Sequence, residues 1–313
     1  MYINFEKILF VITYICPGRC AHCQSASGQG KTKGALNPDM AEKALRSVAK
    51  KYTIGSVLMF GGEPMLYPDT VCRLVSAASD MGIEGRGIIT SGFVKADNDI
   101  QNARKWAREL SDSGIVNVLL SVDVFHEKNI PFEPVYAFAG ELIKHGTNVQ
   151  LHPAWVGGKD MENEYNIRTR QVLDKFSHLG LLESSGNIVF PSGNANVNLR
   201  NYFQNPPIET FKDYRCGDAP YTSPLNNIGE LAVEPDGNVK VCDFIIGNIY
   251  EEELISIAES YDPYTNEEMS LLIESGPYAL YEKKRKQGTA VNTEGLLTAC
   301  DLCSRVCHKG HGR

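Results

Sequence analysis

Long apolar runs are missing from this sequence of 313 residues. No stretch approaches the ~20 consecutive apolar residues that a membrane-spanning helix requires. Residues 1–7 also lack the basic segment and apolar stretch that begin a secretory signal. Internal repeats and low-complexity tracts are absent as well. We therefore expect a cytoplasmic protein that does not contact a membrane.

Positive charge is also scarce in this sequence. Lys and Arg number 31 against 38 Asp and Glu, so the formal net charge is −7. A nucleic-acid surface depends on clustered Lys and Arg side chains that neutralise phosphates. The charge balance therefore argues against nucleic acid as a partner. Hydrophobic residues make up 42%, which is enough for the core of one large domain, alone or with a small extra domain.

Disulfides are not expected either, although the chain has nine cysteines. Their number is odd, and the cytosol keeps thiols reduced. Three of them lie between Cys16 and Cys23, five lie beyond residue 215, and only Cys72 stands alone. This clustering near both ends of the chain predicts two metal sites built from thiolates.

Short β-branched runs alternate with longer amphipathic segments. The expected strands are Ile8–Ile15, Ser56–Phe60, Gly87–Thr90, Val116–Asp123, Asn148–Trp155 and Asn187–Pro191. The expected helices are Pro38–Tyr52, Asp69–Met81, Asp97–Ser113, Pro134–His145 and Thr169–Leu179, with Asn37 and Asp97 as candidate N-caps. Strands that alternate with helices form parallel βαβ units with right-handed crossovers. The pattern predicts an α/β fold with a partial (β/α)6 barrel of the TIM type.

The alternation stops after residue 191. Residues 192–225 are rich in Asn, Pro and Ser and are expected to form a connector. Two alternating runs then flank Asp236-Gly237 within residues 228–242, which is the pattern of a β-hairpin. A helix near Glu251–Tyr261 and a cysteine-rich tail follow. We therefore divide the chain into a barrel domain, residues 1–200, and a smaller domain with a hairpin and a helix, residues 201–313.

The first cysteine group, Cys16, Cys20 and Cys23, directly follows the first expected strand. Three thiolates on one loop can hold three irons of a [4Fe–4S] cluster and leave the fourth iron open for a ligand. Parallel α/β barrels place their chemistry on such loops. A structural zinc site is the alternative, but zinc prefers four ligands, and His22 would have to complete the set from a cramped position.

The CxxxCxxC spacing, with His22 as the aromatic residue before the last cysteine, resembles the radical S-adenosylmethionine (SAM) superfamily. The second matching segment is Gly61-Gly62-Glu63-Pro64, which follows the second expected strand. The resemblance implies that this segment binds the amino group of SAM. It also implies that residues at the ends of the third and fourth strands contact the SAM carboxylate or ribose: Thr90, Ser91, Ser121 and Asp123.

Reductive cleavage is the chemistry that this resemblance implies. An electron from the reduced cluster would cleave SAM to methionine and a 5′-deoxyadenosyl radical, which abstracts a hydrogen atom from the substrate. The resemblance therefore implies a peptide or small-molecule substrate and an external one-electron reductant of the flavodoxin or ferredoxin type. His126 is a candidate for facing the substrate, and a structural role is the alternative.

The second cysteine group lies in the tail, as Cys300, Cys303 and Cys307, with Cys242 after the hairpin and Cys216 before it. This layout resembles the SPASM or shortened twitch extensions of radical SAM enzymes, which hold auxiliary [4Fe–4S] clusters. Five cysteines imply one cluster and one spare thiol. We assign Cys242, Cys300, Cys303 and Cys307 to the cluster and leave Cys216 spare. In the alternatives, Cys216 is a ligand and Cys307 is spare, or the site holds a structural zinc.

A spare cysteine that faces a carbon radical can donate a hydrogen atom and invert a stereocentre. Radical SAM peptide epimerases resemble this chain in layout, so we expect epimerisation of a peptide, with Cys216 as the donor. One alternative is a dehydrogenase or bond-forming enzyme, acting on a peptide or a sugar or aminoglycoside, whose auxiliary cluster accepts an electron. A further alternative is a non-catalytic Fe–S or zinc protein.

Overall fold

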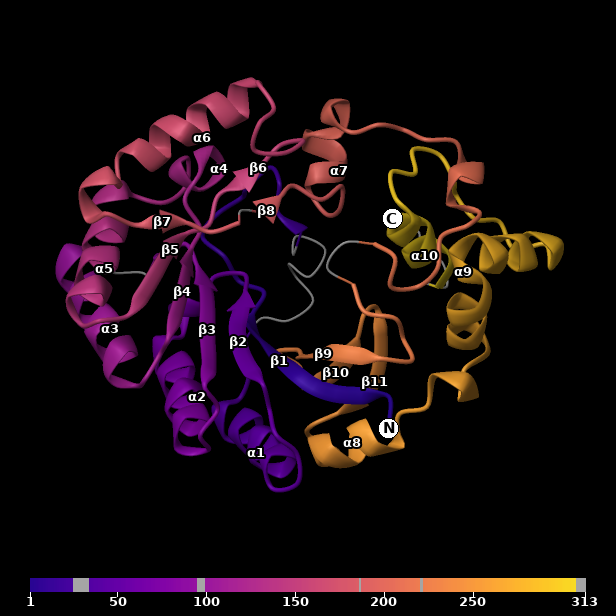
Figure 1. Ribbon diagram of the computed structural model, residues 1–313, viewed down its shortest axis with the longest axis horizontal. Helices are drawn as coiled ribbons and strands as arrows, with labels where there is room; N and C mark the ends of the chain where they lie inside the picture. The colour runs from indigo at the N-terminus through magenta and orange to yellow at the C-terminus, as the bar shows by residue number, and fades with distance from the viewer. Residues whose placement is uncertain (25–33, 95–98, 186, 220–221, 308–313) are drawn as a thin grey trace.

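One nine-stranded sheet organises the computed structural model (Figure 1), which describes residues 1–24, 34–94, 99–185, 187–219 and 222–307. The strands of this sheet are β1 (Ile3–Thr13), β2 (Ser56–Gly61), β3 (Gly85–Thr90), β4 (Asn117–Leu120), β5 (Asn148–Leu151), β7 (Leu182–Glu183), β9 (Ile228–Val233), β10 (Asn238–Val241) and β11 (Phe244–Asn248). Their order is β11-β10-β9-β1-β2-β3-β4-β5-β7. From β1 to β7 every neighbouring pair is parallel, which confirms the α/β class and the partial barrel.

Helices cover the outer face of the parallel strands (Figure 1). Those that follow β1 to β5 are α1 (Pro38–Ala49), α2 (Pro68–Asp80), α3 (Ile100–Asp112), α4 (Val124–Glu127), α5 (Phe132–Lys144) and α6 (Glu164–Asp174). Asn37 caps α1 as expected, because its side chain accepts hydrogen bonds from the N–H groups of Asp39 and Met40. The other expected cap, Asp97, lies outside the described residues, and Asp99 caps α3.

The strand expected at Asn148–Trp155 is interrupted. It divides into β5 and β6 (Ala154–Trp155), with Pro153 between them. Proline has no N–H group to donate to a neighbouring strand, so it tends to end a strand. The sequence pattern alone did not place this break.

The prediction that Asn187–Pro191 forms the sixth strand of the barrel was wrong. The first residues of this segment form β8 (Asn187–Ile188), which pairs with β6 in a separate two-stranded sheet. The main sheet instead ends with β7, which pairs with β5. Because β7 is only two residues long, it carries no periodicity that a sequence pattern could reveal.

The hairpin forms where the pattern predicted it, but it extends the main sheet. β9 lies parallel to β1, with Phe10 beside Val233, and β10 and β11 follow in antiparallel order. Leu231 and Val233 share one hydrophobic core with Ile8 and Phe10. The division between residues 200 and 201 stays a prediction, because both the sheet and the core continue across it.

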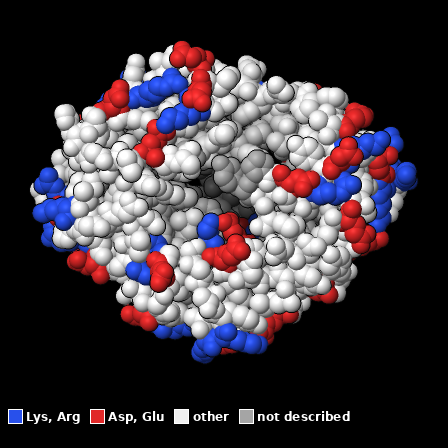
Figure 2. Space-filling view, viewed as in Figure 1, with Lys and Arg blue, Asp and Glu red and all other residues white. Residues whose placement is uncertain are grey.

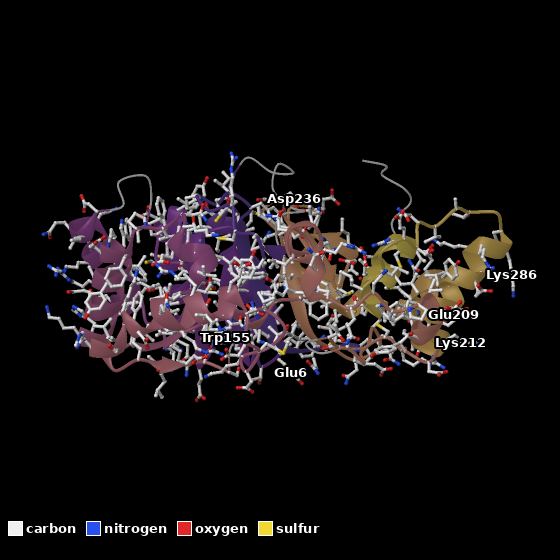
Figure 3. The ribbon with its side chains drawn as sticks, turned by 90° about the horizontal axis from the view of Figure 1, so that it is seen from above. Glu6, Trp155, Glu209, Lys212, Asp236 and Lys286 are labelled. Atoms are coloured by element: carbon white, nitrogen blue, oxygen red, sulfur yellow. The ribbon has the colours of Figure 1, made fainter. Side chains whose placement is uncertain are left out.

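Short elements and the C-terminal helices complete the chain. They are η2 (Pro64–Leu66), η3 (Ser177–Leu179), α7 (Ala195–Asn198), η4 (Arg200–Tyr202), η5 (Ile208–Phe211), α8 (Leu254–Ser260), η6 (Pro263–Thr265), α9 (Glu267–Lys286) and α10 (Ala299–Cys307). Helices α9 and α10 lie beside the barrel rather than across its face (Figures 1 and 3). Among the described residues, no helix combines the length and the apolar composition needed to cross a membrane.

The inner face of the sheet can be traced through its register. Leu9 of β1 lies between Ala232 of β9 and Leu58 of β2, and neighbours in register point to the same side. Leu58 shares its side with Phe60, because side chains alternate along a strand. The face of the molecule that Figure 2 shows is hollowed near its middle, with acidic and basic side chains beside the hollow.

Helix α9 contains a sharp kink at Gly276, where φ is 79° and Pro277 follows. A Cβ atom at Gly276 would lie 1.9 Å from the carbonyl oxygen of Tyr214. That carbonyl belongs to the loop that leads into Cys216, so the absence of a side chain at Gly276 lets α9 pack directly on this loop.

We predict that Gly276→Ala lowers the free energy of unfolding by about 3–4 kcal/mol, since it combines left-handed strain with a backbone clash. Gly288→Ala is the matched control, because Gly288 has a φ of 78° and nothing within 4 Å of its added Cβ. It should cost only about 1 kcal/mol. Anaerobic urea denaturation measures both variants, and equal losses would show that the contact with Tyr214 is unimportant.

Candidate functional site

The three cysteines that follow β1 meet in one loop. A Cβ atom at Gly18 would lie 3.3 Å from the Cys20 sulfur and 3.6 Å from the Cys16 sulfur, so both thiols gather around this glycine. The N–H of Cys23 donates to the carbonyl of Cys20 across 3.2 Å, which turns the loop. Burial raises the pKa of Cys16 to about 11 and that of Cys20 to about 12. These thiols therefore need the positive charge of a metal to lose their protons.

Two glycines at the end of β2 pack against the backbone that leads into this loop. The N–H of Gly62 donates to the Thr13 carbonyl across 2.6 Å. Added Cβ atoms would lie 2.4 Å from that oxygen at Gly61 and 2.2 Å from the Ile15 carbonyl oxygen at Gly62. Neither position accepts a side chain, so the glycines let the end of β2 contact the backbone that enters Cys16.

Glu63 is buried, with 1% of its surface exposed. Its carboxylate accepts hydrogen bonds from the Thr90 hydroxyl at 2.5 Å and from the N–H groups of Met65 and Ser91 at 2.9 and 2.8 Å. The Ser91 hydroxyl donates a fourth. Burial raises the pKa of Glu63, and these donors oppose the shift. Glu63 therefore ties β2 to β3, and Pro64 begins η2 immediately after it. Binding of an ammonium by its carboxylate stays a prediction.

Asp123 is fully buried at the start of α4. Its Oδ1 accepts from the N–H groups of Phe125 and His126 and from Nδ1 of His126, at 2.8, 3.0 and 2.9 Å. Its Oδ2 accepts from the N–H of Ala154 at 3.1 Å. Burial by itself would raise the pKa of Asp123, but the charge and hydrogen bonds of His126 lower it well below its usual range. Asp123 therefore remains ionised beneath His126.

His22 packs between two rings near this carboxylate. Its ring centroid lies 4.6 Å from that of Phe125 and 5.3 Å from that of His126. Burial lowers the pKa of His22 to about 4, and its Nδ1 has no hydrogen-bond partner among the described residues. Ligand atoms of His22, Asp123 and His126 lie within 4.8 Å of one another. Whether His22 contacts a cofactor stays a prediction.

A cavity of about 300 Å³ unites these groups. Its lining includes all the expected residues of the first site except Pro64, namely Cys16, Cys20, His22, Cys23, Gly61, Gly62, Glu63, Thr90, Ser91, Ser121 and Asp123. His126 and His152 line it as well. The expectations from sequence did not include His152, which follows β5 and shares a 2.8 Å hydrogen bond with the Ser184 hydroxyl. Its place after a parallel strand was the signal that could have identified it.

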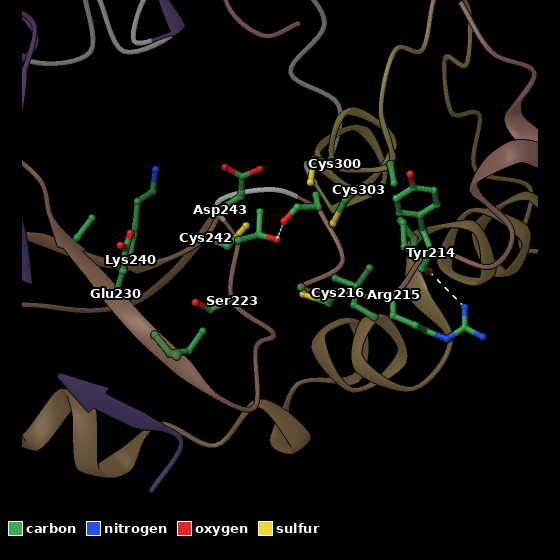
Figure 4. A pocket seen from close by; sticks show the side chains of 18 of the residues that line it. Tyr214, Arg215, Cys216, Ser223, Glu230, Lys240, Cys242, Asp243, Cys300 and Cys303 are labelled. Carbon is green, nitrogen blue, oxygen red and sulfur yellow. Dashed lines mark hydrogen bonds between the residues drawn. The ribbon is translucent and has the colours of Figure 1, made fainter. Parts of the chain in front are cut away.

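The second cysteine group surrounds a cavity of about 260 Å³ (Figure 4). Cys216, Cys242, Cys300 and Cys303 line it. Cys307 does not, although its sulfur lies 3.9 Å from that of Cys303. The nine cysteines all lie in the described part of the chain, and none of them is paired in a disulfide there. The structure thus brings together all five tail cysteines and places Cys216 among the four at the cavity.

Cys242 occupies the two-residue turn between β10 and β11, where Val241 pairs with Phe244. Its φ is 51°, a left-handed conformation that costs a residue other than glycine energy. Turns of this kind favour Asn or Gly. Cys242 therefore holds a strained backbone conformation at the lining of the second cavity.

Residues 10–164 match the sequence model of the Radical SAM superfamily. The chain carries a radical SAM superfamily domain. A segment of 64 residues is also 31% identical to L-lysine 2,3-aminomutase of Fusobacterium nucleatum subsp. nucleatum. That segment covers 20% of this chain and 15% of the relative, so the chain spans only a small part of the relative's length.

The chain is also similar to solved structures. Native anSMEcpe with bound AdoMet has a TM-score of 0.53 and 13% identity over 96% of this chain and 95% of that chain. BtrN in complex with AdoMet and 2-DOIA has a TM-score of 0.48 and 14% identity over 87% of this chain and 89% of that chain. At this identity the likeness to anSMEcpe shows the fold alone.

The radical SAM fold implies a [4Fe–4S] cluster and SAM (AdoMet), and the first site suits both. Three thiols on one loop match a cluster with one open iron. The adjoining cavity meets this loop and the Gly61–Gly62 strand end. The residues of the radical SAM domain therefore fit the cofactors that the family uses.

We predict that Gly62→Ala displaces the Cys16 loop, because the added Cβ would clash with the Ile15 carbonyl oxygen. Overpacking of this kind destabilises a protein by about 1–3 kcal/mol. Iron bound at the first site should then fall by at least about half, measured anaerobically in a variant that also lacks Cys242 and Cys300. Gly34→Ala in the same background is the control, because an added Cβ there has nothing within 4 Å. Full iron loading of the Gly62→Ala protein would contradict the bracing role.

Proposed function

We propose that this chain is a radical SAM enzyme that oxidises a peptide or small-molecule substrate. Cys16, Cys20 and Cys23 would hold the first cluster, and the cavity beside them would hold SAM. The cluster supplies the electron that cleaves SAM reductively, so that a hydrogen atom can be taken from the substrate. In the cytoplasm, an external one-electron reductant of the flavodoxin or ferredoxin type would supply this electron to the protein. The AdoMet bound in anSMEcpe, a protein of similar fold, supports the SAM assignment.

One observation supports the proposal that the enzyme oxidises its substrate: both cysteine sites open on the inner face of a single sheet. Phe60 of β2 lines the first cavity, and Leu9 of β1 and Ala232 of β9 line the second. Leu9 pairs in register with Ala232 on one side and with Leu58 on the other, so these three side chains lie on one face of the sheet. Phe60 lies on the same face, because it is two residues from Leu58 along β2. A substrate on this face therefore lies between the two sites.

A second [4Fe–4S] cluster at the tail cysteines would complete the reaction. After one hydrogen atom is taken from the substrate, such a cluster would supply the acceptor for a second electron, and with the loss of a further proton the substrate would be oxidised by two electrons in total. Cys216, Cys242, Cys300 and Cys303 would be the ligands, because these four line one cavity. This assignment takes the alternative in which Cys307 is spare.

Anaerobic reconstitution tests the proposal. The protein should bind about eight iron atoms, and dithionite with SAM should yield 5′-deoxyadenosine. Cys16→Ala should remove SAM cleavage, whereas Cys242→Ala should leave about four iron atoms and retain cleavage. Cys72→Ala is the control, since this cysteine lies on α2 away from both groups. A fully loaded protein that never cleaves SAM would favour the non-catalytic Fe–S or zinc alternative.

Epimerisation of a peptide is the second candidate, favoured by the count of five thiols for four ligand positions. If α10 supplies Cys300, Cys303 and Cys307 and the turn supplies Cys242, Cys216 is the spare thiol that donates a hydrogen atom. Cys216 is half-buried and lines the second cavity, so it remains a candidate donor.

Paired variants separate the two candidates. In an oxidising enzyme, Cys216→Ala should lose about four iron atoms and Cys307→Ala should lose none. In an epimerase the losses should be reversed, and Cys216→Ala should keep about eight iron atoms while still cleaving SAM. Iron analysis and 5′-deoxyadenosine release measure both outcomes without a known substrate.

A further inference from the structure

The cavity of the first site has two carboxylates but no free carboxylate oxygen. Glu63 and Asp123 each accept four hydrogen bonds from the protein. Each Glu63 oxygen accepts two, whereas Oδ1 of Asp123 accepts three and Oδ2 accepts one. With 1% and 0% of their surfaces exposed, Glu63 and Asp123 offer a ligand no accessible carboxylate oxygen. A ligand hydroxyl in this cavity must therefore bind elsewhere, whereas the family resemblance implied that Asp123 contacts the carboxylate or ribose of SAM.

His126 is the polar side chain that Asp123 presents to the cavity. Its Nδ1 is held by the Asp123 carboxylate at 2.9 Å, and 20% of the side chain is exposed. An ionised carboxylate places the proton on Nδ1, which leaves Nε2 as the available nitrogen. Nε2 makes no hydrogen bond with any described residue, and the imidazole lines the cavity. The nearby His22 ring, at 67° to it, limits its rotation.

We propose that Nε2 of His126 hydrogen-bonds a ribose hydroxyl of SAM and that Asp123 acts only by positioning His126. This inference rests on the proposed function, since it requires SAM in the cavity. The ribose of SAM is joined to the sulfonium through a single methylene, so it must lie beside the methionine part. Both parts therefore fall within the one cavity that holds His126 and the Gly61–Gly62 strand end.

A metal ion is a weaker occupant for the same residues. Ligand atoms of His22, Asp123 and His126 lie within 4.8 Å of one another. A metal would have to displace donors from Asp123, whose two oxygens are already engaged by three N–H groups and the His126 ring. A ribose hydroxyl needs no such displacement, because it uses the nitrogen that has no partner.

The test is a thermodynamic cycle that removes the His126 imidazole from the protein and a ribose hydroxyl from SAM, separately and together. His126→Asn keeps an amide that can donate to Asp123 but removes Nε2. The dissociation constants of SAM, 2′-deoxy-SAM and 3′-deoxy-SAM are measured by calorimetry on the oxidised, iron-loaded proteins. Wild-type protein should bind one deoxy analogue about tenfold more weakly than SAM. In His126→Asn that ratio should fall to about one, with SAM itself about tenfold weaker.

Three results would overturn the inference. The first is a His126→Asn protein that retains the wild-type ratio. The second is a wild-type protein that binds both analogues as tightly as SAM, which needs no variant and so stands even if His126→Asn does not fold. The third is an iron-loaded wild-type protein that does not bind SAM, which would refute the proposed function as well. His178→Asn, at an exposed histidine of η3, is the matched control and should keep wild-type constants.

Discussion

The contact between the end of β2 and the backbone that follows β1 is the constraint on which the first site depends. The Thr13 and Ile15 carbonyls accept N–H groups from Gly62 and Glu63 across 2.6 and 2.9 Å. Parallel neighbours end at the same edge of a sheet, so this contact forms where the cysteine loop begins. The two glycines serve this approach of two backbones, and Glu63 extends it to β3 through Thr90 and Ser91.

The second site depends on β9 lying beside β1. That pairing joins the hairpin to the barrel and places Cys242 on the same sheet as the first cysteine loop. A polar link runs along the shared edge, where Glu234 accepts from the Tyr14 hydroxyl at 2.5 Å and pairs with Lys240 at 2.9 Å. Tyr14 precedes Cys16 by two residues, and Lys240 precedes Cys242 by two. The loops of both sites are therefore held by one group of side chains.

Sequence patterns predicted what local spacing controls. The strands from β1 to β4, the cap at Asn37 and the hairpin at Asp236-Gly237 all follow from periodicity and turn chemistry within a few residues. The same patterns missed the break at Pro153, the short strand β7 and the role of His152, because these depend on which strand lies beside which. The contact of Asp123 with SAM, which the family resemblance implied, stays a prediction, and the structure adds that its oxygens accept from α4 and from Ala154 after β5.

The sequence by itself determined the chemistry available: three thiols on one loop, a glycine pair after the second strand, and five more thiols beyond residue 215. Only the tertiary structure decided which of these groups face each other. The parallel pairing of β9 with β1, the place of Cys216 among the four thiols of the second cavity and the hydrogen bonds that Glu63 and Asp123 accept from other strands all join residues far apart in the chain. Local periodicity fixes which face of a strand is buried, but it carries no information about which strand will be its neighbour.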